Sequence, residues 1–187
     1  MLLPEGGIAT IYLCDLVRKQ WDSYQLNESN IVSGVSVVDV DGNIIYTSPP
    51  SQKLKRWDSY DSSEIPIVSL AGSECNSIYG IAVAKSGNVY MLTACQPPAV
   101  STYKVLKLTA GTGLVTTFAD ASNIGLDIIQ SSVTSRAMAV DNDEAVYVPD
   151  GKSSIWRVAP GNGTFSVYLT GLNAPTDIAV RREEGRL

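Results

Sequence analysis

The chain contains no histidine, so any chemistry it performs must come from carboxylates, amides, hydroxyls, lysines or tyrosines. This composition excludes Ser-His-Asp and Cys-His nucleophiles and every metal site that needs an imidazole ligand. Two carboxylate pairs, Asp39 with Asp41 and Asp141 with Asp143, have one residue between their members. In a strand, both members of a pair would point to one face and could bind a cation. In a turn they would bond to their own backbone, which is the interpretation we favour.

The three cysteines lack the Cys-x-x-Cys spacing of zinc and redox motifs. Cys75 and Cys95 lie at nearly equal distances from the polar turn around Lys85 and Ser86. If that turn closes a hairpin, the two sulfur atoms face each other within a residue or two. We therefore predict a possible Cys75–Cys95 disulfide, which needs an oxidising compartment and would leave Cys14 free.

Charge and hydropathy exclude two classes of partner. A net charge of −5 and a pI near 4.7 argue against nucleic-acid binding, which needs a surplus of Lys and Arg. No stretch approaches the ~20 apolar residues that cross a bilayer, so no membrane span is expected. The N-terminus lacks the pattern of a secretory signal, but two Asn-x-Ser/Thr sequons begin at Asn27 and Asn162. Localisation stays open, with a lean to an extracytoplasmic or secreted protein.

A short pattern that repeats along the chain indicates the elements that position these residues. A strand of small apolar residues, a polar turn and a strand with a tyrosine follow one another in residues 80–91, 35–46 and 137–147, and the pattern starts again at residue 177. Turn glycines between Val-, Ile- and Tyr-rich flanks are typical of β-hairpins. Each copy is therefore predicted to be a hairpin.

Two further strands follow each hairpin. The third strand carries an aromatic residue, and the fourth is weaker, so that each unit resembles a four-stranded propeller blade. Regular repetition favours a structural role in packing between blades, although a stacking platform would use the same residue types. These aromatic residues are Trp21, Trp57, Tyr103 and Trp156.

The predicted fold is an all-β propeller of four-stranded antiparallel blades, forming a single domain over residues 1–187. The blade units are approximately 1–33 with 175–187, 34–75, 76–134 and 135–174. We expect four blades closed by pairing of the N- and C-terminal strands, which would leave no unpaired edge at the seam. Two alternatives stay open: a fragment of a larger propeller, and a homodimer that shares one larger ring.

Carboxylates and loops outside the hairpin turns supply the remaining candidates. Asp15 and Asp150 each lie three residues after a tyrosine and are expected to tie down the loop after the second strand. The third unit is longer than the others. Its extra residues include Asp120, Asn123 and Asp127, and long insertions between strands are where binding specificity is often added. These three residues are the predicted binding-loop residues.

Two segments resemble known propeller families. Tyr147–Val158, preceded by Ala137–Asp141, resembles an NHL-type repeat. Glu5-Gly6-Gly7, with the following Ile11–Leu16 and Gln20–Asp22, is similar to the opening blade of the gluconolactonase, senescence-marker-protein and strictosidine-synthase-like group. The resemblance implies a divalent cation, Ca²⁺ or Zn²⁺, in the central channel, with Glu5 as a ligand.

Two functions follow. The residues before the inner strands, Tyr79, Arg136 and Thr176, are not ligands that a hard cation prefers. With the absence of histidine, this favours a non-catalytic scaffold that binds a protein or small ligand through its loops and channel mouth. The alternative implied by the resemblance is a divalent-metal-dependent lactonase or ester hydrolase, so whether the protein is an enzyme stays open. We expect a monomer or a ring-sharing homodimer.

Overall fold

The computed structural model describes ten segments: residues 2–5, 8–15, 20–25, 35–39, 41–48, 53–58, 64–70, 73–95, 102–121 and 137–180. For residues 2–5, 8–15, 20–25, 48, 64–66 and 76 only the backbone is described. These segments fold into strands and turns, and they contain no helix that could cross a bilayer. The predicted all-β class is confirmed.

The strands form four antiparallel sheets in which chain order is also spatial order. Three sheets have four strands, as predicted for the repeated unit, and the N-terminal sheet has three described strands. The N-terminal sheet consists of β1 (Leu2–Glu5), β2 (Ile8–Asp15) and β3 (Gln20–Gln25). The second sheet consists of β4 (Ser36–Val38), β5 (Ile44–Ser48), β6 (Lys53–Trp57) and β7 (Glu64–Ser69). The third sheet consists of β8 (Cys75–Val83), β9 (Val89–Cys95), β10 (Thr102–Leu108) and β11 (Val115–Asp120). The fourth sheet consists of β12 (Ala139–Val140), β13 (Val146–Pro149), β14 (Ile155–Val158) and β15 (Phe165–Leu169).

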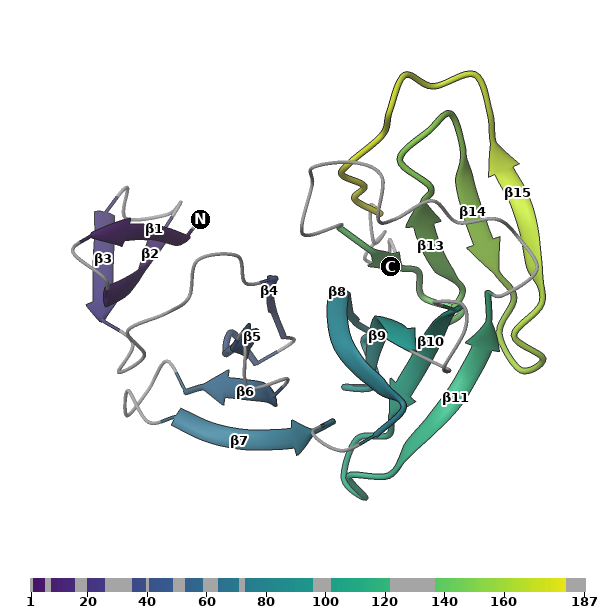
Figure 1. Cartoon of the computed structure of the whole chain (residues 1–187). Helices are drawn as coiled ribbons and strands as arrows, with labels where there is room; N and C mark the ends of the chain where they lie inside the picture. Colours follow the sequence, from purple (N-terminus) through teal and green to yellow (C-terminus); the bar gives the residue numbers. More distant parts are fainter. Residues whose placement is uncertain are drawn as a thin grey trace, which may run out of the picture.

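The second, third and fourth sheets follow one another around a common centre (Figure 1). The first strand of the third sheet, β8, contacts both β4 and β12, so the first strands lie innermost. Strand β9 is buried at every position, which is expected of a continuous apolar run covered on both faces. The outermost β15 is exposed at four of its five residues. Burial therefore decreases from the centre outward.

Apolar clusters fill the junctions between neighbouring sheets. One joins the second sheet to the third through Ile45, Leu54 and Met91, and another joins the third to the fourth through Tyr90, Val105 and their neighbours. The predicted packing aromatics Trp57 and Tyr103 are 2% and 6% exposed, and Trp156 packs against the second of these clusters. The side chain of Trp21 lies outside the described part of the chain.

The first hairpin of each four-stranded sheet closes with the same turn. In this turn, the N–H of the first residue donates to the carbonyl of the fifth. The three turns span residues 39–43, 84–88 and 141–145. The Oδ1 atoms of Asp39 and Asp141, at the first turn position, accept backbone N–H bonds from the third and fifth positions. The alternating carboxylate pairs are therefore turn residues, because the first member bonds its own backbone.

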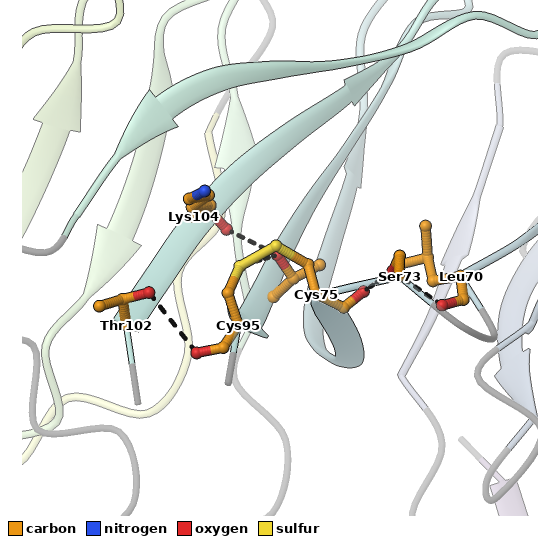
Figure 2. Close-up of a disulfide and its surroundings, with 7 residues drawn as sticks. Leu70, Ser73, Cys75, Cys95, Thr102 and Lys104 are labelled. Atoms are coloured by element: carbon orange, nitrogen blue, oxygen red, sulfur yellow. Dashed lines mark hydrogen bonds between the residues drawn. A yellow bond between two sulfur atoms is a disulfide. The ribbon is translucent and has the colours of Figure 1, made fainter. Parts of the chain in front are cut away.

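Cys75 and Cys95 form the predicted disulfide (Figure 2). They are direct partners in the register between β8 and β9. Two register shifts in β8, between Cys75 and Ser77 and between Ile78 and Gly80, absorb the small inequality of their distances from the turn. Counting residues from a hairpin turn was therefore enough to pair them.

The described C-terminal residues do not pair with β2 as the expected closure requires. The segment 177–180 was expected to pair with the strand that contains Tyr12, but both edges of that strand, β2, are taken by β1 and β3. A strand has only two hydrogen-bonding edges, so β2 has no place for a third partner. Instead, Ile178 and Val180 pack against the fourth sheet, on Ala139, Tyr147 and Ile155.

Asp150 follows β13 and anchors the next loop, whereas only the backbone of the corresponding Asp15 is described. Asp150 is 8% exposed, and its Oδ1 accepts N–H bonds from Lys152, Ser153 and Ser154 at 2.8–3.0 Å. Burial by itself would raise the pKa of this carboxyl, but the backbone donors outweigh burial and lower it.

We expect Asp150→Ala to lower the free energy of unfolding by about 2 kcal/mol, because three backbone donors, of which that of Ser154 is buried, lose their acceptor. Asp150→Asn keeps an acceptor oxygen and should lose less. Urea unfolding of both variants measures the difference, and equal losses would contradict the capping role. Since the folded pKa is lowered, the stabilisation should be present above the ordinary pKa of aspartate and fade as the pH falls below it.

Candidate functional site

A cleft of about 510 Å³ opens between the second and third sheets. Its walls come from the β4–β5, β8–β9 and β10–β11 turns and from the strand residues beneath them. Three turns from two sheets therefore meet around one cavity. The lining residues are Asp39, Asp41, Ile45, Arg56, Ile67, Lys85, Ser86, Gly87, Val89, Leu108, Thr109, Ala110, Gly111 and Gly113.

The cleft holds two carboxylates and two cations, so its formal charges balance. Asp39 is committed to its own turn, where Oδ1 caps the backbone and Oδ2 accepts from the Asn43 amide at 3.1 Å. Arg56 differs, because its Nε is buried and has no hydrogen-bond partner among the described residues. A buried donor without an acceptor costs about 1–3 kcal/mol. Arg56 is therefore the group in the cleft that most needs an acceptor.

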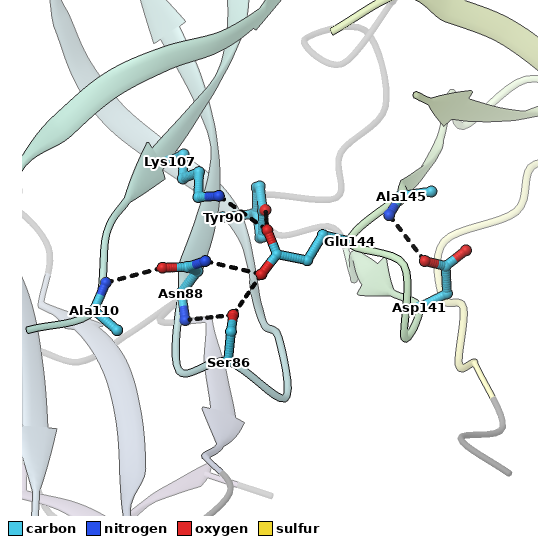
Figure 3. A network of polar contacts seen from close by, with 8 residues as sticks. All are labelled: Ser86, Asn88, Tyr90, Lys107, Ala110, Asp141, Glu144 and Ala145. Atoms are coloured by element: carbon cyan, nitrogen blue, oxygen red, sulfur yellow. Dashed lines mark hydrogen bonds and ion pairs between the residues drawn. The ribbon is translucent and has the colours of Figure 1, made fainter. Parts of the chain in front are cut away.

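The next junction, between the third and fourth sheets, is closed by a carboxylate. Glu144, from the β12–β13 turn, reaches the third sheet, where its Oε1 accepts from Ser86 and from Asn88 at 2.8 Å (Figure 3). Its Oε2 accepts from the Tyr90 hydroxyl at 2.6 Å and from the Lys107 ammonium at 2.9 Å. We call Ser86, Asn88, Tyr90, Lys107 and Glu144 the carboxylate clamp.

The clamp sets the charge states of its members. Burial alone would raise the pKa of Glu144, but donors from Ser86, Tyr90, Lys107 and Asn88 outweigh it and lower the pKa to about 2. Burial, followed by the hydrogen bond to Glu144 and its charge, raises the pKa of Tyr90 well above the ordinary value. The pair is therefore a carboxylate and a neutral phenol at neutral pH.

Solved structures with the same arrangement identify the fold. A nidogen/laminin complex contains a chain that superposes with a TM-score of 0.66 at 13% identity, over 94% of this chain and 64% of that one. TolB from Acinetobacter baumannii superposes with 0.59 at 16% identity, over 95% and 44%. A streptogramin B lyase gives 0.57 at 17% identity, over 92% and 54%. All three are β-propeller proteins. The chain has a β-propeller fold.

The four-stranded sheets are therefore propeller blades. At these identities the comparison establishes the fold alone, and the chain spans about half to two thirds of the three structures' lengths. The sequence matches no family model and no curated protein. The resemblance to NHL-type and gluconolactonase-like repeats therefore stays a prediction.

The described residues at the propeller axis offer no side-chain ligand for a channel cation. A cavity of about 370 Å³ lies between the inner strands of the second, third and fourth blades and residues 178–180, and the residues that line it all have apolar side chains. Ca²⁺ requires oxygen ligands and Zn²⁺ requires nitrogen, sulfur or carboxylate ligands. Within the described segments, no three Cys, Asp or Glu residues are grouped to hold a metal. The residues described here do not fit a channel metal.

Of the other predicted metal and binding-loop residues, only Asp120 has a described side chain. The side chain of Glu5, the predicted metal ligand, lies outside the described residues, as do Asn123 and Asp127 of the binding loop. Asp120 ends β11 and is exposed, in register with Lys104 on β10. Asp120 does not line the cleft.

Sequence reasoning missed Arg56 and Glu144. Glu144 occupies the turn position that glycine holds in the other two turns, and its φ of 64° is a conformation that side chains rarely adopt. This departure from the repeat was visible in the sequence and could have marked the residue. Arg56 carried no such signal, since an arginine in a strand is ordinarily solvated.

Proposed function

We propose that the protein is a non-catalytic β-propeller that binds a small ligand in the cleft between its second and third blades. The observation that carries the proposal is the Arg56 Nε, which is buried beside this cleft and has no acceptor among the described residues. Pockets of a few hundred cubic ångströms with apolar walls and a few convergent polar groups are the usual form of small-molecule sites. A ligand acceptor would satisfy the arginine.

The fold is compatible with binding and with catalysis, since the similar structures include a streptogramin B lyase and a nidogen/laminin complex. Because the chain has no histidine, nucleophilic or acid–base chemistry in the cleft would require Asp41, Ser86 or Lys85. Ser86 already donates to Glu144. No described observation favours the alternative of a metal-dependent lactonase or ester hydrolase.

Localisation and assembly stay predictions. The disulfide supports the lean to an extracytoplasmic protein, because such bonds persist in oxidising compartments. A monomer and a ring-sharing homodimer both stay open.

Filling the cleft should abolish binding. Thr109 lines the cleft, and no hydrogen bond of its side chain is described, so we expect Thr109→Trp to occupy the cavity without breaking a contact. Saturation-transfer NMR on a panel of small acids, amines, amides and sugars should find compounds that bind the wild type and no longer bind this variant.

Thr116→Trp is the matched control, because Thr116 is exposed on β11 and does not line the cleft. It should bind the same compounds as the wild type. The proposal fails if no compound in the panel binds, or if those that bind the wild type bind Thr109→Trp equally well.

A further inference from the structure

The strand registers show which residues are equivalent in the three four-stranded blades. Ile45, Tyr90 and Tyr147 each pair with the second-last residue of the inner strand on one side. On the other side, Ile45 pairs with Arg56 and Tyr90 pairs with Lys107. Arg56 in the second blade therefore holds the place of Lys107 in the third.

The hairpin turns are equivalent in the same way. Gly87 and Glu144 both stand at the fourth turn position, and both donate their N–H to the carbonyl of the first position. Their φ angles are 83° and 64°. At the junction of the third and fourth blades this position supplies the carboxylate of the clamp. At the junction of the second and third blades it supplies no side chain at all.

The cleft is consequently the clamp position of the preceding junction, without its carboxylate. Arg56 and Gly87 both line it, in the places that Lys107 and Glu144 take one blade later. Within the described part of the chain, the buried Nε of Arg56 has no acceptor, whereas the Lys107 Nζ at the clamp has the Glu144 Oε2 at 2.9 Å. The volume of the cleft and the Arg56 Nε, which has no acceptor among the described residues, therefore lie at the same position of the blade repeat.

We propose that the cleft binds a small monocarboxylate whose carboxylate pairs with Arg56, in the place that Glu144 fills at the next junction. This inference rests on the proposed function and specifies its ligand class. Guanidinium groups favour carboxylates because their N–H donors match the two oxygens. Asp41 stands where the clamp has Ser86, so a second negative charge on the ligand would be repelled.

The Arg56 Nε–H resonance reports directly on this contact. We expect it to shift saturably when ¹⁵N-labelled protein is titrated with propionate, with its assignment made from Arg56→Lys. Propionamide has the same shape without the charge, and phosphate has charge without the shape. Both should bind at least about tenfold more weakly. No saturable shift with propionate, or an equal response to either comparison compound, overturns the proposal.

Gly87→Glu gives a second measurement by supplying the missing carboxylate from the chain. Its Cβ would lie 3.3 Å from the Ala110 Cβ, a tight contact, and its φ of 83° is strained for any side chain. Gly87→Gln carries the same strain and bulk without the charge. We expect Gly87→Glu to be the more stable of the two and to shift the Arg56 resonance as propionate does. Equal stability of the two variants, with no such shift, contradicts the assignment.

The two proposals fail in different ways. If the compounds that bind the wild type but not Thr109→Trp include no carboxylate, the cleft remains a binding site and the proposed ligand class is wrong. Binding unaffected by Thr109→Trp would overturn the cleft itself. Glu144→Gly serves as the positive control for propionate binding. It removes the carboxylate of the clamp and leaves Lys107 without its ion-pair partner.

Discussion

Replacing Glu144 with alanine is expected to lower the free energy of unfolding by about 2–3 kcal/mol. The change leaves four donors without their acceptor, and the side chain is only 26% exposed, so water can replace it only in part. It also removes three hydrogen bonds between blades, which join Glu144 to residues 54 to 58 positions earlier in the sequence. Urea unfolding followed by tryptophan fluorescence measures the loss.

The contribution of Glu144 should depend on pH. Its folded pKa of about 2 lies below its ordinary value of 4.5, so the folded state binds fewer protons than the unfolded state between these values. The stabilisation is then fully present above about pH 5 and is lost as the pH falls toward 2. Tyr90 acts in the opposite sense: its pKa is raised, so stability should fall as the pH rises above the ordinary tyrosine range.

Three variants separate charge, shape and strain. Glu144→Gln keeps the shape but loses the ion pair to Lys107, and it should flatten the acid dependence. Glu144→Gly relieves the positive φ and should lose less stability than alanine by roughly 1 kcal/mol. The neighbouring Asp143 is exposed, so Asp143→Ala should change stability by less than about 0.5 kcal/mol. A loss at Asp143 equal to that at Glu144 would show that the clamp has no special role.

Breaking the Cys75–Cys95 disulfide should cost about 3 kcal/mol, because the bond closes a loop between residues 20 positions apart. Both half-cystines are also buried in the cluster between the second and third blades. The single variant Cys75→Ala, the single variant Cys95→Ala and the double variant should lose similar amounts, since any one of them removes the whole bond. Urea unfolding with and without reductant should give the same difference for the wild type.

Thiol counting provides the chemical control. Denatured, unreduced protein should show one reactive thiol, which we assign to Cys14, and reduced protein should show three. Three thiols before reduction, or additive losses from the single variants, would contradict a stabilising bond.

Local sequence was sufficient for the parts of the fold that depend on neighbouring residues. The hairpins around Gly42 and Gly87 follow from turn residues between apolar flanks, and both glycines have the positive φ that such turns need. The Cys75–Cys95 pair followed from the same reasoning, because a hairpin turn fixes which residues lie opposite each other. Alternation and turn chemistry act over a few residues, so they can be read directly from the chain.

The tertiary structure alone decided which residues meet across blade junctions. Arg56 and Gly87 border one cleft, and Glu144 reaches Lys107, because neighbouring sheets pack against each other. It also decided that β1, and not residues 177–180, pairs with β2. Such contacts depend on how whole sheets compete for faces and edges, whereas the repeat in the sequence specifies only the individual sheet.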